Sequence, residues 1–256
     1  MRLAVVVPVF NQVAITRRSV ESLLENTTEP DWQLILVDDG STDDTPVYVN
    51  ELKNRLGNLV SHIEHGENLG VTAAWNSGIA LSRALDASYV AICNNDLLYT
   101  PGWEQGLLRA LQDDSLLAVV SPLSTFGPVP EDWPKGMGRG PNPAGYSGYM
   151  PLLGACFMCR TSLFDEIGVF PSELKMYFGD NWIVLASQAK GYECGYANES
   201  YLHHLFCQTT NTLNNGPLWA HDSPAFEKIA AKLGVMRPYL LRNGQRAEDL
   251  PVTGVK

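Results

Sequence analysis

Residues 89–96 have the sequence YVAICNND, in which five apolar or aromatic residues are followed by three polar ones. The apolar run is short enough for a buried strand, and the cluster Asn94-Asn95-Asp96 follows at its carboxyl end. In open α/β sheets, ligands bind at that end of the strands. One carboxylate beside two amides suits a divalent cation held by few protein ligands. The alternative is a plain turn before Pro101, and the rest of the chain must decide between the two.

The first 120 residues alternate strands and helices with a period of about 30 residues, which predicts βαβ units and a parallel sheet. Strands are expected at residues 3–7, 33–37, 59–64, 89–93 and 116–120, with helices between them. Further on, we expect a strand at 152–160, a helix from Asp180, a strand-like run at 201–207 and a last helix from Ser223.

The composition is that of a globular protein with a core, because 45% of the residues are hydrophobic and 18% are charged. The net charge of −10 argues against a nucleic-acid partner and gives no support for attachment to an anionic membrane. No run approaches the roughly 18 consecutive apolar residues of a transmembrane helix. The five cysteines are an odd number without a secretion signal, so reduced thiols and a cytoplasmic location are expected.

Residues 124–151 are dense in glycine and proline and show no periodicity of their own. A connection of this length is usually either functional or disordered. It contains three aromatic residues that could contact a ligand, Trp133, Tyr146 and Tyr149. We therefore expect this segment to form a lid or to bind the acceptor.

Polar clusters follow three of the expected strands and should meet at one edge of the sheet. They are Pro8-Val9-Phe10-Asn11, Asp38-Asp39-Gly40-Ser41 and Asn94-Asn95-Asp96. Phe10 could pack against a nucleobase, and Asp39 could accept the imide N–H of that base. Asn68, Gly70 and Asn76 lie at the next strand-to-helix turn, where a helix N-terminus favours phosphate. The chain contains neither G-x-x-x-x-G-K-[ST] nor G-x-G-x-x-G, so P-loop and dinucleotide-binding motifs are unsupported.

Three of these regions resemble family 2 glycosyltransferases, which are nucleotide-sugar enzymes of GT-A fold. The regions are residues 7–11, residues 37–45, and residues 67–70 together with 76–78. The similarity continues more weakly through 154–160, 164–170 and the helix at Asp180, and covers roughly residues 3–235. The resemblance implies an α/β fold with a mixed, mostly parallel central sheet flanked by helices. It also implies one domain over residues 1–236, with a nucleotide-sugar-binding half at 1–100, an acceptor-binding half at 101–236 and a C-terminal tail at 237–256.

By that resemblance Asn94-Asn95-Asp96 takes the place of the D-x-D metal motif. Asp96 matches the carboxylate that binds Mn²⁺ or Mg²⁺ against the diphosphate, whereas the first acidic position is an amide here. A single carboxylate should bind metal weakly until the diphosphate completes the coordination shell. His203 and His204 lie where relatives place a histidine that contacts metal or phosphate, and strand alternation points only one of them into the site. We favour His204, and we expect the histidines outside this pair to be solvated or structural.

Asp180 resembles the catalytic base of the family's Glu-Asp motif, with Gly179 where glutamate is common. The resemblance implies metal-dependent, inverting transfer of a sugar from a nucleotide sugar, with a UDP-sugar favoured. The acceptor would be a hydroxyl of a carbohydrate or glycoconjugate, as in polysaccharide biosynthesis. A non-catalytic nucleotide-sugar or glycan-binding module is one alternative, encouraged by Asn94 and Gly179. A sugar nucleotidyltransferase is another, although residues 8–11 lack the Gly-rich basic loop that such an enzyme should carry.

Overall fold

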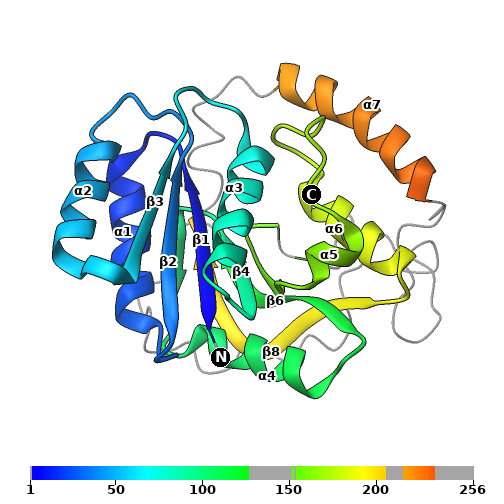
Figure 1. Ribbon diagram of the computed structural model, residues 1–256, viewed down its shortest axis with the longest axis horizontal. Coiled ribbons are helices and arrows are strands. Elements are labelled where there is room, and N and C mark those ends of the chain that lie inside the picture. The colour runs from blue at the N-terminus through cyan, green and yellow to red at the C-terminus, as the bar shows by residue number, and fades with distance from the viewer. Residues whose placement is uncertain (1, 127–151, 153, 206–215, 234–256) are drawn as a thin grey trace.

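The computed structural model of the chain describes residues 2–126, 152, 154–205 and 216–233. Its elements in chain order are β1 (Leu3–Val9), α1 (Val13–Asn26), β2 (Trp32–Asp38), α2 (Thr45–Leu56), the 3₁₀ helix η1 (Gly57–Leu59), β3 (Val60–Glu64), α3 (Val71–Ala84), β4 (Tyr89–Cys93), β5 (Leu97–Tyr99), α4 (Trp103–Asp113), β6 (Leu117–Phe126), β7 (Cys156–Arg160), α5 (Leu163–Ile167), α6 (Gly179–Ala189), β8 (Glu193–His204) and α7 (Gly216–Leu233). The strands form one eight-stranded sheet in the order β3-β2-β1-β4-β7-β6-β8-β5 (Figure 1).

The first four strands of that order pair in parallel, so their carboxyl ends lie along one edge of the sheet. Strand β7 is antiparallel to both of its neighbours, β4 and β6. Beyond them β6 and β8 pair in parallel, and β5 closes the edge antiparallel to β8. The sheet is therefore mixed and mostly parallel, as predicted.

Residues of β1 alternate between two hydrophobic cores, one on each face of the sheet. Leu3, Val5 and Val7 pack with residues of α1, α2 and α4, whereas Ala4 and Val6 pack with residues of α3 and α6. All five side chains are at most 1% exposed. Burial on both faces explains why β1 is an unbroken apolar run rather than an alternating one. Figure 1 shows α1 and α2 on one side of strands β1–β3 and α3 on the other.

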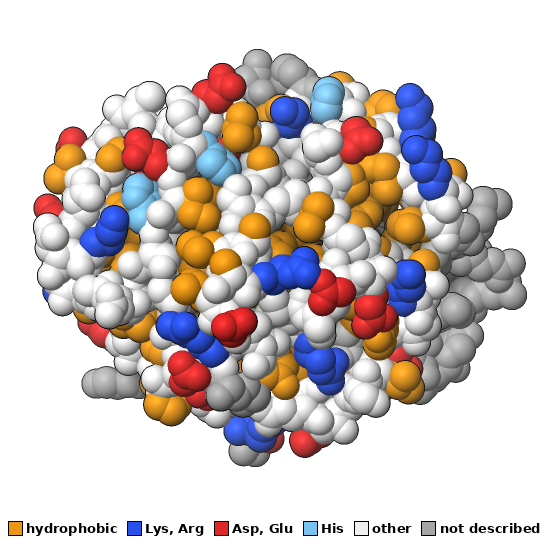
Figure 2. Space-filling model, in the orientation of Figure 1, with side chains coloured by type: hydrophobic (Ala, Val, Ile, Leu, Met, Phe, Trp, Pro, Cys, Tyr) orange, Lys and Arg blue, Asp and Glu red, His pale blue; other side chains and the backbone are white. Residues whose placement is uncertain are grey.

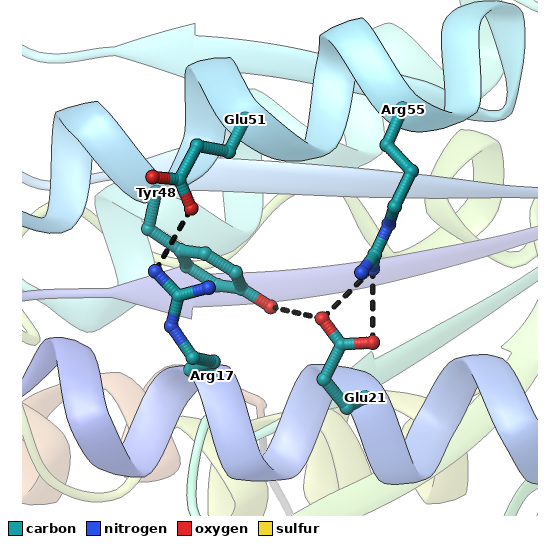
Figure 3. Close-up of polar contacts among 5 residues, drawn as sticks. All are labelled: Arg17, Glu21, Tyr48, Glu51 and Arg55. Atoms are coloured by element: carbon teal, nitrogen blue, oxygen red, sulfur yellow. Dashed lines mark hydrogen bonds and ion pairs between the residues drawn. The ribbon is translucent and has the colours of Figure 1, made fainter.

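Helices α1 and α2 are joined at the surface by charged pairs around Tyr48 (Figure 3). Arg17 pairs with Glu51 at 2.9 Å, and its guanidinium carbon lies 4.2 Å from the centre of the Tyr48 ring. Arg55 pairs with Glu21 at 2.8 Å, and Glu21 also accepts the Tyr48 hydroxyl. Burial, assisted by the charge of Glu21, raises the pKa of Tyr48, so its hydroxyl remains a donor. Because the charged side chains are 34–54% exposed, each pair contributes at most about 1 kcal/mol and mainly fixes orientation.

Strand β5 is not predicted from the sequence, yet it fixes the residues just before it. Its N–H groups at Leu97 and Tyr99 donate to Ser19 and Ser22 of α1, at 3.2 and 2.9 Å. Its other side pairs with the end of β8. A three-residue strand without an alternating pattern gives no periodic signal, but hydrogen bonds on both sides hold it in place.

Three further elements extend beyond their expected bounds. Strands β6 and β8 are longer than the apolar runs at 116–120 and 201–207, because they pair with each other through polar stretches and two register shifts. Helix α7 contains Pro224, although a start at Ser223 is expected from the sequence. A proline inside a helix removes one backbone hydrogen bond and crowds the carbonyl four residues earlier, yet α7 is helical on both sides of Pro224.

Within the described residues, no helix has the length and apolar character needed to cross a membrane. On the face shown in Figure 2, Lys and Arg side chains are intermixed with those of Asp and Glu. Nucleic-acid phosphates bind to surfaces where basic side chains gather, and the described part of this face shows no such gathering.

Helix α3 crosses β1 where a side chain does not fit. A Cβ atom on residue 78 would overlap Cγ1 of Val6, which is fully buried. We expect Gly78→Ala to lower the free energy of unfolding by about 1–3 kcal/mol, because the added methyl forces the helix away from the sheet. Denaturant unfolding measures the change. Gly66→Ala is the control, since a Cβ there meets nothing within 4 Å. Equal losses in both variants would contradict the packing argument.

Candidate active site

The clusters predicted from the sequence meet at the carboxyl edge of the parallel strands. Val9 at the end of β1 pairs with Asp38 at the end of β2. Pro8 and Val9 belong to β1, and Val9 is buried, whereas Phe10 after the strand is only half-buried. The N–H of Asn94, directly after β4, donates to the Ala155 carbonyl at 2.8 Å. The edge therefore carries groups from both halves of the chain.

Asn11 joins the turns that follow β1 and β2. Its Oδ1 accepts the backbone N–H groups of Thr42 and Asp43 at 2.7 and 3.3 Å, and its own N–H donates to Ser41 Oγ at 2.8 Å. Its φ of 55° lies in the left-handed region, which asparagine tolerates better than most residues. The side chain of Asn11 therefore shapes the two turns, and the protein backbone already engages its carbonyl oxygen.

Asp39 is held by three hydrogen-bond donors. Its Oδ1 lies 2.7 Å from His65 Nδ1 and accepts the Leu69 N–H at 3.0 Å. Its Oδ2 accepts the Gly70 N–H at 2.9 Å. The other ring nitrogen of His65, Nε2, lies 2.9 Å from Ser77 Oγ. Since the side chains of His65 and Asp39 are only 10% and 6% exposed, the pair forms part of the wall of this edge.

His65 is a residue of this edge that is not identified from the sequence. A solvated or structural role is expected for it, and the structure places it in direct contact with Asp39. The signal that could have identified it is its position, because it follows β3 directly, as the other clusters follow their strands.

Three other residues are assigned to the nucleotide: Asn68 and Gly70 lie in the turn between β3 and α3, whereas Asn76 lies inside α3 rather than at the turn expected for it. Gly70 has a φ of 100°, and a Cβ there would lie 2.6 Å from the carbonyl oxygen of Lys175, so only glycine fits. Asn76 clamps the backbone of Phe170, donating from Nδ2 to its carbonyl and accepting its N–H at Oδ1, both at 2.9 Å. Asn68 is exposed. Asn68 is the more exposed of the two asparagines, while the half-buried Asn76 makes a structural contact.

Asp96 and His204 lie side by side where β5 begins and β8 ends. His204 Nε2 is 3.1 Å from Asp96 Oδ1, and the two side chains are 8% and 5% exposed. This contact follows from strand pairing, because Leu97 of β5 lies opposite His204. His203 contacts Thr125 instead, with 2.7 Å between Nδ1 and Oγ1. Alternation along β8 thus brings His204 to Asp96 and turns His203 to another neighbour.

The pair formed by Asp96 and His204 fits a partial cation site. Carboxylate oxygen and neutral imidazole nitrogen are both ligands of Mn²⁺. Octahedral coordination at about 2.1 Å places adjacent ligand atoms about 3 Å apart, which matches the observed spacing. Within the described residues, no group of three or more His, Cys, Asp or Glu side chains is placed to hold a metal. The two side chains therefore fit a metal whose remaining ligands are phosphate oxygens and water.

The two amides before Asp96 connect to different elements. Asn95 is 7% exposed, and its Nδ2 donates to Thr16 Oγ1 of α1 at 2.8 Å. Asn94 is half-buried and is bonded through its backbone to the residue before β7. The backbone that carries Asp96 is thus anchored to a helix on one side and to a strand on the other.

Asp180, the second residue of α6, lies close to this cluster. Its Oδ1 accepts the Asn181 N–H at 2.9 Å, and a Cβ on Gly154 would come within 2.5 Å of its Oδ2. The next residue, Ala155, accepts the N–H of Asn94, so two consecutive residues link Asp180 to the 94–96 cluster. Burial raises the pKa of Asp180 above its ordinary value of 3.8, against the opposing effect of the Asn181 hydrogen bond. A carboxylate with a raised pKa is a better general base.

The resemblance described above implies a glutamate at the position of Gly179, and the packing around Gly179 leaves no room for a side chain. A Cβ on Gly179 would overlap the ring of Trp75 and would lie 3.2 Å from Thr72 Cγ2. Trp75 is 4% exposed and packs edge-on against Phe157 and Phe170. An aromatic core therefore fills the space that a longer side chain at this position would need.

A buried carboxylate on α7 holds the segment before α6. Oδ2 of Asp222 accepts the N–H groups of Lys175, Met176 and Tyr177 at 3.0, 2.7 and 2.8 Å, and its Oδ1 lies 2.7 Å from His221 Nδ1. Burial opposes ionisation, but these hydrogen bonds lower the pKa of Asp222. The segment also packs against the N-terminus of α3. No sequence pattern distinguishes Asp222 from other acidic residues, because its partners are backbone groups far away in the chain.

Some predicted residues lie outside the described residues. These are the three aromatic residues expected to contact the acceptor, Trp133, Tyr146 and Tyr149. Residues 127–151, which make up most of the Gly- and Pro-rich segment, and the tail at 237–256 lie outside them as well. The predictions for these segments remain predictions.

Curated relatives resemble less than half of the chain. The chain is 36% identical over 107 residues to a dodecaprenyl-phosphate galacturonate synthase from Rhizobium johnstonii, a match that covers 40% of this chain and 30% of that protein. It is 30% identical over 121 residues to a chondroitin synthase from Escherichia coli, which covers 47% of this chain and 17% of that protein. The chain thus spans less than a third of the length of either relative.

Solved structures resemble a larger part of the chain. The structure of GalNAc-T7 with UDP, GalNAc and Mn²⁺ superposes with a TM-score of 0.66 at 16% identity, covering 80% of this chain and 44% of that chain. A mannosyltransferase from Pyrobaculum calidifontis in complex with GDP-Man and Mn²⁺ gives 0.61 at 15% identity, covering 91% and 73%. At such low identity the similarity concerns the fold alone, and it confirms the GT-A fold class expected from the sequence.

A family model described as glycosyl transferase family 2 matches residues 4–168, which extend from β1 through α5 and include the turns after β1, β2, β3 and β4. The matched region contains Asp39 and Asp96, and it is more than half of the chain. This chain belongs to glycosyl transferase family 2.

Proposed function

We propose that this chain transfers a sugar from a nucleotide sugar, favouring a UDP-sugar, to a hydroxyl of a carbohydrate or glycoconjugate acceptor. The transfer depends on Mn²⁺ or Mg²⁺ and inverts the anomeric configuration. The observation that carries the proposal is the contact of Asp96 with His204 near a partly buried carboxylate, Asp180, whose pKa is raised. The presence of UDP or GDP-Man together with Mn²⁺ in two structures of this fold supports the donor class and the metal.

In this proposal each polar residue has one task. Phe10 and Asp39 hold the nucleobase, and Asp96 with His204 holds the metal. The metal, when bound, neutralises the negative charge that develops on the leaving diphosphate. Asp180 removes the proton from the acceptor hydroxyl as that oxygen attacks the anomeric carbon. Burial of Asp180 supports this task, because it raises the affinity of the carboxylate for a proton.

The remaining residues assigned to the nucleotide act through the geometry of the turns. Asn11 and Asn76 hold backbone segments together, so we propose that they position the donor without contacting it through their amides. The N-terminus of α3, opened by Gly70, offers backbone N–H groups to a phosphate, and Asn68 lies exposed beside it. Asn94 and Asn95 anchor the backbone that carries the metal ligand.

We propose that residues 1–236 form a single domain. Strands from both halves share one sheet, since β4 of the first half pairs with β7 of the second, and β5 of the first half pairs with β8 of the second. Both hydrophobic cores contain residues from each half of the chain. Neither half could bury its face of the sheet without the other.

We also propose that the protein acts in the cytoplasm. The four cysteines in the described residues, Cys93, Cys156, Cys159 and Cys194, are free thiols. Burial raises the pKa of Cys194 to about 12 and raises that of Cys159 further, so both remain protonated. Unpaired thiols are typical of a reducing compartment.

A non-catalytic nucleotide-sugar-binding module is the second candidate. It is favoured by the amide at Asn94 and by the small number of metal ligands among the described residues. Nucleotide binding without hydrolysis or transfer across a broad panel of acceptors would support it over the enzyme.

The first prediction concerns the two carboxylates. We expect Asp96→Ala and Asp180→Asn each to lower turnover of the preferred nucleotide sugar by at least about 100-fold, because leaving-group stabilisation and proton removal are each worth that much. Release of the nucleoside diphosphate measures turnover, with Mn²⁺ and with EDTA. Asp113→Asn, which changes an exposed carboxylate on α4, should leave turnover unchanged. Full activity in both site variants would overturn the assignment.

The second prediction concerns the pH dependence of stability. Folding raises the pKa of Asp180 from its ordinary 3.8, so the folded state is the better proton acceptor. The wild-type protein should therefore lose stability relative to Asp180→Asn as pH rises above that value, and the difference should level off above the folded-state pKa. Thermal unfolding across pH measures this difference. A difference that does not vary with pH would show that Asp180 ionises as freely in the folded chain as in the unfolded one.

The third prediction concerns metal affinity. Because the described residues supply two ligands, the protein alone should bind Mn²⁺ weakly, and UDP should tighten that binding by at least about tenfold. Titration calorimetry of Mn²⁺ with and without UDP measures the coupling. His204→Ala should abolish the coupling but leave metal-free UDP binding intact. Tight Mn²⁺ binding by the protein alone would contradict a site that depends on diphosphate.

A further inference from the structure

We infer that His65 selects the nucleobase of the donor by occupying one oxygen of Asp39, so that the site accepts a base edge with a single N–H donor. The imide edge of uracil has one N–H donor and fits this site. The edge of guanine has two neighbouring N–H donors, and this arrangement disfavours it. The inference rests on the proposed function, because it assigns a specificity-determining residue to the nucleotide site.

The argument begins with the number of acceptor positions on Asp39. An ionised carboxylate offers about four lone-pair positions, two on each oxygen. Donors among the described residues take both positions on Oδ1, namely His65 Nδ1 and the Leu69 N–H. One position on Oδ2 is taken by the Gly70 N–H. One acceptor position therefore remains within the described residues, and it lies on Oδ2.

The imidazole of His65 is fixed at both of its nitrogens. Nδ1 faces the carboxylate at 2.7 Å and must donate, so in the neutral ring Nε2 accepts the hydroxyl of Ser77 at 2.9 Å. The His65 backbone is also held, since its N–H donates to the Asp38 carbonyl at 2.8 Å. With its side chain 10% exposed, the ring has little room to swing away when a ligand arrives.

The other two donors to Asp39 are backbone groups that no side-chain change removes. A Cβ on Gly40 would lie 2.6 Å from the Glu67 carbonyl carbon and 2.8 Å from the Asn68 nitrogen, so the 66–70 turn lies directly on the 38–41 turn. Gly70 in turn packs against the Lys175 carbonyl. Of the three donors, only His65 is a side chain, and it is the one that substitution can change without moving the turns.

The donor patterns of the bases then decide the preference. The imide of uracil presents one N–H between two carbonyl groups, which needs one acceptor. Guanine presents an N–H and an amino group side by side, and this pair matches a carboxylate only when both oxygens are available. Because both positions on Oδ1 are taken, guanine would bury one N–H donor without an acceptor. Such a donor loses its hydrogen bond to water, so the binding free energy of guanine becomes less favourable. The Asp39 side chain is 6% exposed, consistent with room for one contact.

The test compares the binding of UDP and GDP to the full chain by titration calorimetry with Mn²⁺ present. We expect the wild-type protein to prefer UDP by at least about tenfold, the effect of one hydrogen bond to a charged acceptor. His65→Leu frees one acceptor position on Oδ1 and should reduce that ratio by at least about tenfold, chiefly through tighter GDP binding. His65→Asn keeps an N–H near the position of Nδ1 and should keep the wild-type preference.

An unchanged ratio in His65→Leu, or a wild-type preference for GDP, overturns the inference. If His65→Leu does not fold, Ser77→Ala serves in its place. Ser77→Ala removes only the partner of His65 Nε2 and keeps the hydrogen bond from Nδ1 to Asp39. It should therefore lower the preference for UDP over GDP by about threefold, less than His65→Leu does. An unchanged ratio in Ser77→Ala then overturns the inference. Transfer activity distinguishes failure of this inference from failure of the proposed function. If the protein transfers a sugar but the UDP/GDP binding ratio does not depend on His65, the inference fails and the proposed function stands. If the protein binds neither UDP nor GDP, both fail.

Discussion

The antiparallel pairing of β4 with β7 is the constraint on which the site depends. It sets Cys93 opposite Cys156, so the residues that follow one strand lie beside the residues that precede the other. Asn94 therefore bonds to Ala155, and Gly154 meets the carboxylate of Asp180. The polar cluster at the end of a parallel half-sheet and the carboxylate of α6 come together because one reversed strand joins the two halves of the chain.

Much of the fold and part of the site can be predicted because they follow from local patterns. Apolar runs at intervals of about 30 residues predict the parallel strands, and the sudden change to polar residues after Cys93 marks the edge where ligands bind. Strand alternation predicts that only one of His203 and His204 points into the site. Each of these inferences uses only neighbours in sequence or a regular repeat.

The rest depends on contacts between turns and cannot be derived from any repeat. The contact of Asp39 with His65 arises because the turn after β3 lies on the turn after β2, and Asp222 meets three backbone N–H groups more than 40 residues away. Strand β5 and the extension of β6 along β8 are held by hydrogen bonds between segments without apolar alternation. The departure at Gly179 from the family's pattern is likewise explained only by the ring of Trp75 on another helix.

The contacts of Asp222 show that the unit that must fold is longer than the region of sequence similarity. The family model ends at residue 168, which on similarity alone would mark a natural place to end a fragment. A chain cut there loses Asp180, and one cut before α7 leaves the N–H groups of residues 175–177 without the carboxylate that accepts them. That segment supports the start of α6 and packs on Gly70 at the start of α3. The last helix therefore belongs to the architecture that supports the proposed donor site, although it lies outside the matched region and far along the chain from the motifs that define the family.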